Sequence, residues 1–523
     1  MGVHSKQQAH RTDFLVLGIG SVCILCLVLL PLLVISVFNH SYADDWHYGV
    51  WAHLALQQSQ GNVLAAVAEA LRQVGVAWFD WQGTYSAIFL MALQPGVFSE
   101  SAYVVSAWIV LALLVGCTLY FVRTIMRICL HDYSYAWLSV ASALLVVQLL
   151  LQPSPVEGIF WYNSAIYYTG YHALLLLLMG FIIRTMTIEK LWVFIVRVCV
   201  ATLLALFVAG GNFVTLLVAL ELGVSATIAV IVKRHGKMAC VVIPTIALIL
   251  GAIVSFSAPG NEVRQQVQFP NTKLGVLDTI VQSTGASLHG LMDWVDGFVV
   301  IMLLFLLPLF VYVLRQSGIV QKFSFSQPGW VSIASMALFA SSFTPTLYSM
   351  GTVGPGRVQN CRFDLLVILL AVNLVWWIGW VLHKRLIEAA ALQDASVDMP
   401  AQPQPLFSAR KVAHICAGIG LVFTVILSAS YAHAASREKL SSLSAFHSIV
   451  TGQAQSYDRQ VSNRIYLIET SHEQEVTVPF YRNVPHVLLM GDIRDNMDNY
   501  VNYRLAQWYG KKSIIGYSLQ PKR

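Results

Sequence analysis

The chain has 523 residues, of which 57% are hydrophobic and only 11% are charged, and its mean hydropathy is +0.66. A soluble globular protein carries roughly 25% charged residues, so most of this chain belongs inside a lipid bilayer, where charge is costly. The formal net charge of +6 would suggest an anionic partner in a soluble protein. In a membrane protein, the distribution of the basic residues along the chain is more informative than the net charge. We therefore expect no nucleic-acid partner.

Eleven apolar runs approach the roughly 20 residues that a helix needs to cross the hydrocarbon core. They are 14–37, 103–124, 135–151, 168–186, 191–209, 212–232, 239–257, 298–315, 330–347, 363–382 and 412–430. The first run could also be a secretory signal, but it is about twice as long as a typical signal core, so a retained helix is favoured. The sequence predicts an all-α polytopic membrane protein with about eleven transmembrane helices.

Lysine and arginine are distributed unevenly between alternating loops. With the N-terminus inside, the inner segments hold fifteen of them, and the outer loops hold five: Arg72, Arg264, Lys273, Arg357 and Arg362. This bias predicts a multi-pass protein of an inner or plasma membrane with a cytoplasmic N-terminus. An odd number of spans then places the C-terminal segment 431–523 outside. The expected outer loops, where function concentrates, are 38–102, 152–167, 258–297 and 348–362.

Two adjacent acids, Asp44 and Asp45, follow the first span directly, and His47 lies beside them. At headgroup depth, desolvation and mutual repulsion can raise the pKa of one carboxylate, which suits a proton acceptor working near neutral pH. The alternative is that both acids only solvate a helix end. Residues 50–77 then have the pattern of an amphipathic helix lying along the membrane, followed by an aromatic stretch that includes Trp81.

The second outer loop interleaves aromatic residues with Glu157, Tyr162 and Asn163. This composition suits a polar cavity that binds sugar rings, and it equally suits an aromatic girdle at the membrane surface.

The later outer loops add Glu262 and three arginines, Arg264, Arg357 and Arg362. The planar guanidinium group of arginine has N–H donors whose geometry matches phosphate oxygens. Each of these arginines could instead bind an ordinary phospholipid or pair with an acid. Glu221 lies well inside a predicted span, and we expect it to make a structural hydrogen bond between helices.

The C-terminal segment is more polar than the rest of the chain. Runs at 465–468, 475–478 and 486–490 are typical of strands, whereas 439–462 and 497–509 are typical of helices. The sequence predicts a small extracytoplasmic α/β domain over 431–523, after a transmembrane catalytic module over 1–430. Residues 390–409 have the composition of a linker.

Several of these motifs, in this order, resemble the GT-C superfamily of integral membrane glycosyltransferases. They are Asp44-Asp45 after the first helix, the Trp-Gln-Gly-Thr-Tyr stretch 81–85, Pro-Gly-Asn-Glu-x-Arg at 259–264, Pro-Gly-Arg at 355–357, and the tail stretches 492–495, 499–503, 508–510 and 513–514. The resemblance is closest to bacterial enzymes that decorate O-antigens, wall polysaccharides or teichoic acids. It covers most of the chain through scattered short motifs.

The resemblance implies transfer of a sugar from a polyprenyl-phosphate donor to a cell-surface glycan or glycolipid at the outer leaflet, with inversion. It implies that Asp44 or Asp45 is the general base, with Asp44 favoured. Arg357, then Arg264 and Arg362, are expected at the donor phosphate. Candidates for sugar or acceptor contacts are His47, Trp81, Glu157, Tyr162, Asn163 and Glu262.

No cofactor is expected. A metal is disfavoured because no second acidic motif can be placed, although His47 beside the acids leaves room for one. The expected partners are the lipid-linked donor, the glycan acceptor, membrane lipids, and a protein that makes or flips the donor lipid. Three other functions remain open: a transporter or flippase for lipid-linked glycans, a non-catalytic polysaccharide-assembly or receptor protein, and a ligase or polymerase that acts on a whole glycan.

Overall fold

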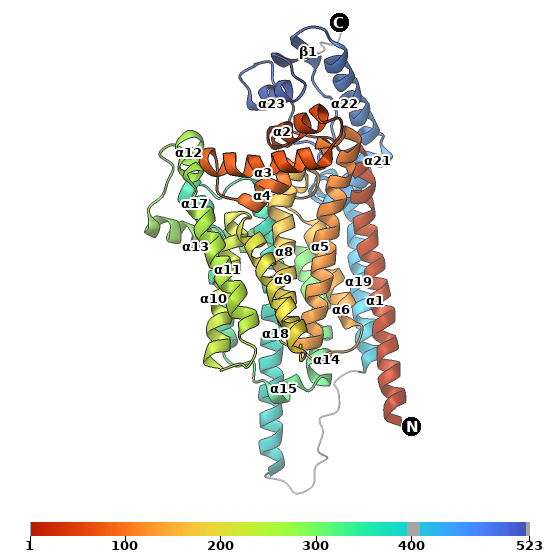
Figure 1. Cartoon of the computed structure of the whole chain (residues 1–523). Helices are drawn as coiled ribbons and strands as arrows, with labels where there is room; N and C mark the ends of the chain where they lie inside the picture. The colour runs from red at the N-terminus through yellow and green to blue at the C-terminus, as the bar shows by residue number, and fades with distance from the viewer. Residues whose placement is uncertain (1, 395–407, 519–523) are drawn as a thin grey trace.

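The computed structural model describes residues 2–394 and 408–518, so the predicted linker 390–409 lies largely outside the described residues. Long helices run side by side in a bundle, and shorter helices form a layer across its upper end (Figure 1). The N-terminus lies at the lower end of the bundle and the C-terminus above the upper layer (Figure 1). We call these two ends the lower end and the upper end.

The bundle consists of long apolar helices. They are α1 (Gly2–Ile35), α5 (Val105–Thr124), α6 (Ala136–Leu150), α8 (Tyr171–Thr185), α9 (Leu191–Ala209), α10 (Phe213–Val232), α11 (Ala239–Phe256), α14 (Gly297–Gln316), α16 (Pro328–Ser341) with α17 (Thr344–Met350), α18 (Gly356–Asp394) and α19 (Ala409–Ala432). Within the described residues, ten helical segments are long and apolar enough to cross a membrane. The exception among the eleven predicted spans is α6, a shorter apolar helix. The prediction of an all-α polytopic membrane protein is confirmed at this level.

The outward faces of these helices are apolar. In α9, for example, Leu191, Trp192, Ile195 and Leu203 are all more than half exposed. Such a surface would be unfavourable in water but is suited to lipid, where only segments with internally bonded backbones are stable. A lipid environment therefore accounts for both the helical form of these segments and their exposed apolar faces.

The first predicted outer loop forms the upper layer. It contains α2 (Asp44–Gln58), α3 (Val63–Asp80), α4 (Tyr85–Ala92) and the short turns η2 (Pro95–Val97) and η3 (Glu100–Val104), after η1 (Ser36–Phe38). The single amphipathic helix predicted over 50–77 is in fact two helices. The chain reverses at Gln60 and Gly61, both at positive φ, and Asn62 caps α3 by accepting a hydrogen bond from the Leu64 amide.

The other predicted outer loops are also largely helical. They contain η5 (Val156–Phe160), α7 (Tyr162–Ala165), η6 (Ile166–Gly170), α12 (Pro259–Gln268) and α13 (Val276–Trp294). Near the lower end lie η4 (Ile125–Cys129) and α15 (Ile319–Lys322). Because α18 already begins at Gly356, the last predicted outer loop is only a short connection.

The C-terminal segment contains α20 (Ala434–Lys439), α21 (Ser441–Val450), α22 (Gln453–Thr470), β1 (Glu475–Pro479), α23 (Tyr500–Trp508) and β2 (Ser513–Tyr517). The two strands pair in parallel, with Glu475 opposite Ser513. The strand predicted at 475–478 is confirmed, and β2 was not predicted.

Two predicted strands are wrong. Residues 465–468 belong to α22, whose buried positions Tyr457, Val461, Arg464 and Ile468 recur every three or four residues, the period of a helix. Residues 486–490 form a turn in which Val487, Leu488 and Leu489 are all buried. A strand with one covered face would instead alternate buried and exposed positions.

Candidate functional site

The two adjacent aspartates begin α2 at the upper end, after a backbone turn at Ala43 with φ 47°. Their environments differ sharply. Asp45 is fully buried, and its carboxylate accepts hydrogen bonds from the Tyr42 amide (3.0 Å), the Asn163 amide (3.1 Å) and the Tyr103 hydroxyl. Burial raises the pKa of Asp45 to about 8, although these three hydrogen bonds act in the opposite direction. Asp45 thus ties α2 to η3 and α7 in the interior.

Asp44 remains partly exposed. Its Oδ1 accepts a hydrogen bond of 2.6 Å from the hydroxyl of Tyr500, which lies 456 residues later in the chain. Its backbone carbonyl accepts one of 2.7 Å from Asn163 Nδ2. Asn163 therefore binds both aspartates, and Asp44 is the one whose carboxylate a further ligand can reach.

Tyr48, one turn after Asp44 in α2, lies within electrostatic reach of charged groups from three separate segments. Burial raises the pKa of Tyr48 to about 12, Asp44 raises it further, and Arg264 of α12 and Arg357 of α18 act to lower it. A Coulombic effect on the same phenol requires that all three charged groups lie near it. The fold thus brings together the favoured acid and the two favoured arginines.

Arg357 stands in the first turn of α18 and pairs with the buried Glu157. Its Nη1 donates to Glu157 Oε1 (2.9 Å), and its backbone amide donates to Oε2 (2.9 Å). Its guanidinium also lies over the Trp161 ring at 5.3 Å. A Cβ on Gly356 would stand 2.5 Å from Glu157 Oε2, so this close approach needs the glycine of the Pro-Gly-Arg stretch.

Arg264 connects two of the quoted motifs. Its Nη1 donates to Gln82 Oε1, its Nε donates to Gln268 Oε1 (3.1 Å), and its guanidinium lies 5.6 Å from the Trp81 ring centroid. The 81–85 and 259–264 stretches also pack backbone to backbone. A Cβ on Gly260 would stand only 2.4 Å from the backbone nitrogen of Trp81, so this approach needs a glycine. Trp81 and Arg264 are therefore neighbours in space.

The remaining predicted site residues take other positions. The fully buried Arg362 donates to Ser342 O, Val353 O, Gln359 Oε1 and Thr346 Oγ1. These bonds use four of its five N–H donors, so the contacts support a role in fixing the 342–354 segment.

Glu262 is exposed on α12 and accepts from Gln266 Nε2 (3.0 Å). Tyr162 is buried, and its amide donates to the Tyr103 hydroxyl (3.0 Å). The His47 ring lies 4.7 Å from that of Tyr48. Burial, and then the positive charge of Arg504, lower the pKa of His47 to about 4, so its imidazole is neutral at physiological pH.

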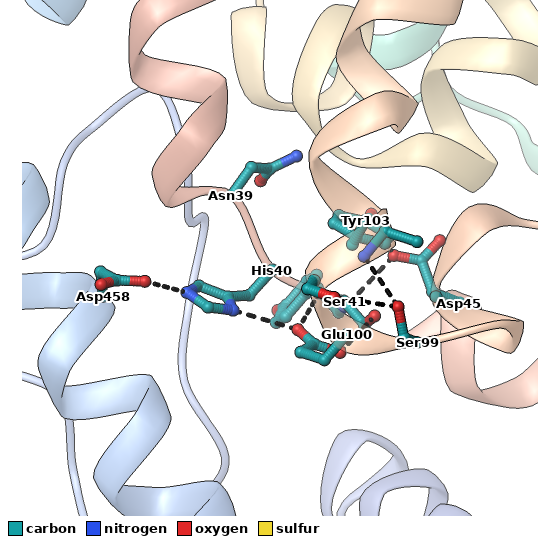
Figure 2. Close-up of polar contacts among 12 residues, drawn as sticks. Asn39, His40, Ser41, Asp45, Ser99, Glu100, Tyr103 and Asp458 are labelled. Atoms are coloured by element: carbon teal, nitrogen blue, oxygen red, sulfur yellow. Dashed lines mark hydrogen bonds and ion pairs between the residues drawn. The ribbon is translucent and has the colours of Figure 1, made fainter.

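A largely enclosed histidine next to the site joins three segments. Figure 2 shows His40 between Glu100, at the start of η3, and Asp458 of α22. Its Nδ1 lies 3.1 Å from Glu100 Oε1 and its Nε2 lies 3.0 Å from Asp458 Oδ1. Burial alone lowers the pKa of His40, but the bonds with Asp458 and Glu100 outweigh it and raise the pKa to about 9. The C-terminal segment is thus held to the first loop by a protonated histidine.

Sequence reasoning missed three residues. Tyr500 lies in a quoted stretch and Tyr48 only in the first predicted outer loop, and nothing in the sequence showed that they would lie near Asp44. Asp364 of α18 is fully buried beside Gln148 of α6, about two turns below Arg357. It escaped notice because it lies at the edge of the predicted span 363–382. Glu221 accepts a 2.7 Å hydrogen bond from Ser341 of α16, which is the expected bond between helices.

Among the described residues, no group of three or more His, Cys, Asp or Glu side chains comes together in a way that could hold a metal ion. No protein-family model matches the chain, and no curated protein matches it in sequence.

Proposed function

We propose that the protein is a glycosyltransferase that moves a sugar from a polyprenyl-phosphate donor to a glycan acceptor at the upper end of the bundle. The observation that carries the proposal is that Asp44, Arg264 and Arg357 all lie near the partly buried phenol of Tyr48. Residues 161–163 contact two of them directly, because the Arg357 guanidinium lies over the Trp161 ring at 5.3 Å and Asn163 Nδ2 donates to the Asp44 carbonyl at 2.7 Å. An accessible carboxylate opposite two guanidiniums provides a proton acceptor and a phosphate-binding pair in one place. The order of motifs that resembles the GT-C superfamily supports the same function.

In this proposal Asp44 is the general base. It takes the proton of an acceptor hydroxyl as that oxygen forms a bond to the anomeric carbon. The bond between this carbon and the phosphate oxygen breaks on the opposite face of the sugar, and its electron pair leaves with the polyprenyl phosphate. The configuration at the anomeric carbon is therefore inverted.

Asp45 is a poorer candidate for the base. Its carboxylate is fully buried and already accepts three hydrogen bonds, so no acceptor hydroxyl can approach it without rearrangement of α2. We assign it to holding the start of α2 in place, which positions Asp44.

Arg357 and Arg264 are suited to the leaving phosphate. Arginine has five N–H donors. The described side-chain hydrogen bonds use one of them in Arg357 and two in Arg264, which leaves donors on both guanidiniums for phosphate oxygens. Positive charge held next to the leaving oxygen stabilises the transition state, because no reorganisation is needed as the charge develops.

The test is sugar transfer by the purified full-length protein, reconstituted in lipid, with a panel of polyprenyl-phosphate sugars and bacterial surface polysaccharide fragments. Loss of a general base lowers rates by about 10²- to 10⁴-fold, so we expect a loss of that size in Asp44→Asn. Asp80→Asn is the matched control, since Asp80 is an exposed acid of the same upper layer at the end of α3.

Equal transfer by Asp44→Asn and the wild type would exclude Asp44 as the base. Movement of the donor lipid across the bilayer without transfer of its sugar would instead favour the transporter.

A further inference from the structure

Helix α23 of the C-terminal segment lies against α2, next to the proposed base (Figure 1). Asn499 caps it by accepting a hydrogen bond from the Val501 amide. The buried face of α23 presents Asn502, Leu505 and Trp508, and the Trp508 ring stacks on His53 of α2 with centroids 4.3 Å apart. This packing fixes which face of α23 points outward.

The outward face carries an arginine flanked by two aromatic rings. Tyr500 is 43% exposed and Tyr503 is 55% exposed. The Arg504 guanidinium lies 5.2 Å from the Tyr500 ring centroid and 5.1 Å from that of Tyr503. Positions 500, 503 and 504 share one side of a helix, so the three side chains form a single surface, which we call the α23 surface.

The α23 surface is joined directly to the proposed base. The Tyr500 hydroxyl donates to Asp44 Oδ1 at 2.6 Å, and the Tyr500 ring lies 6.1 Å from that of His47. Burial and the neighbouring Asp44 raise the pKa of Tyr500, which keeps the phenol protonated as a donor. Arg504 acts on both Tyr500 and His47, whereas Arg264 and Arg357 act on Tyr48. Cations from different segments, Arg504 on one hand and Arg264 with Arg357 on the other, thus act on the residues next to Asp44.

We propose that the α23 surface binds the acceptor, a carbohydrate chain, and holds its reacting hydroxyl against Asp44. This rests on the proposed function. The exposed tyrosine rings provide flat apolar faces for the C–H faces of sugar rings, and Arg504 provides donors for sugar hydroxyls or carboxylates. The donor phosphate is assigned to Arg264 and Arg357, so donor and acceptor approach Asp44 from different segments of the fold.

The experiment measures steady-state transfer by the reconstituted full-length protein, with donor and acceptor varied separately. In Tyr503→Ala and in Arg504→Gln, we expect the acceptor KM to rise about three- to tenfold, with kcat and the donor KM unchanged. A fault in folding would instead lower kcat or the amount of active protein. Tyr466→Ala is the matched control, because Tyr466 is a 65% exposed tyrosine of α22 in the same C-terminal segment.

A second measurement does not depend on catalysis. Without donor, the wild type should bind the polysaccharide fragment that serves as its acceptor, and Tyr503→Ala should bind it about three- to tenfold more weakly. Unchanged acceptor KM and unchanged binding in both variants would overturn the α23 surface as the acceptor site while leaving the proposed function standing. Absence of any transfer by the wild type would overturn the proposed function itself.

Discussion

At the scale of single residues, burial separates two neighbouring aspartates. The Asp45 carboxylate is enclosed and accepts hydrogen bonds from three donors, two of them fully buried, whereas Asp44 reaches the surface and meets a tyrosine of the C-terminal segment. An amide at position 45 would turn donor hydrogens toward some of those donors, and a buried donor without an acceptor is costly.

We therefore expect Asp45→Asn to destabilise the protein by about 1–3 kcal/mol above pH 8, where the wild-type carboxyl is ionised. Asp44→Asn should change stability much less, because its carboxylate is partly exposed. Thermal unfolding of the two variants in the same detergent checks this. Equal melting temperatures for Asp45→Asn and the wild type would contradict the structural role of Asp45.

At the scale of elements, we expect one of the contacts between the C-terminal segment and the first loop, that of His40 with Asp458, to depend on pH. Bonds with Asp458 and Glu100 outweigh burial and raise the pKa of His40 from 6.5 to about 9. A histidine whose pKa is raised on folding contributes stability that is fully present below its unfolded value and is lost as the pH rises through the folded value. The relevant window therefore runs from about pH 6.5 to pH 9.

Over that window we expect the contact of α22 with the first loop to weaken by about 3 kcal/mol, the free energy that corresponds to this change in pKa. Hydrogen–deuterium exchange of the 453–470 backbone should rise between pH 6.5 and 9.5, after correction for the intrinsic pH dependence of exchange. In His40→Ala the corrected exchange should be high at every pH. His472→Ala, which alters an exposed histidine of the same segment, is the control.

At the scale of the whole molecule, the two chain ends lie at opposite ends of the bundle (Figure 1). In the part of the chain that the structure describes, ten long apolar segments and the shorter α6 make an odd number of crossings if α6 also spans. Together with the excess of lysine and arginine in alternate loops, this leads us to propose that the lower end is cytoplasmic and the upper end is outside.

Cysteine labelling in intact cells tests that orientation. A cysteine at Glu473, in the exposed connection before β1, should react with a membrane-impermeant maleimide. A cysteine at His235, in the exposed turn between α10 and α11, should react only after the cells are made permeable. The reverse pattern would place the proposed site on the cytoplasmic side. The unmodified protein controls for labelling of its own cysteines.

The sequence by itself determined the class, an all-α protein of the polytopic membrane type, and where its long apolar helices lie, because a lipid environment requires continuous apolar helices and leaves few alternatives. It also predicted β1, whereas four consecutive apolar residues at 465–468 fit either a strand or a helix, and packing of α22 decided between them.

The sequence favoured Asp44, Arg357 and Arg264, but only the tertiary structure brought them around Tyr48, buried Asp45 and enclosed Arg362. It also placed Tyr500 on Asp44 across 456 residues of chain. Local sequence patterns show whether a segment has the period of a helix and whether it is apolar enough for lipid. They do not carry the contacts between distant segments, which depend on how the helices pack.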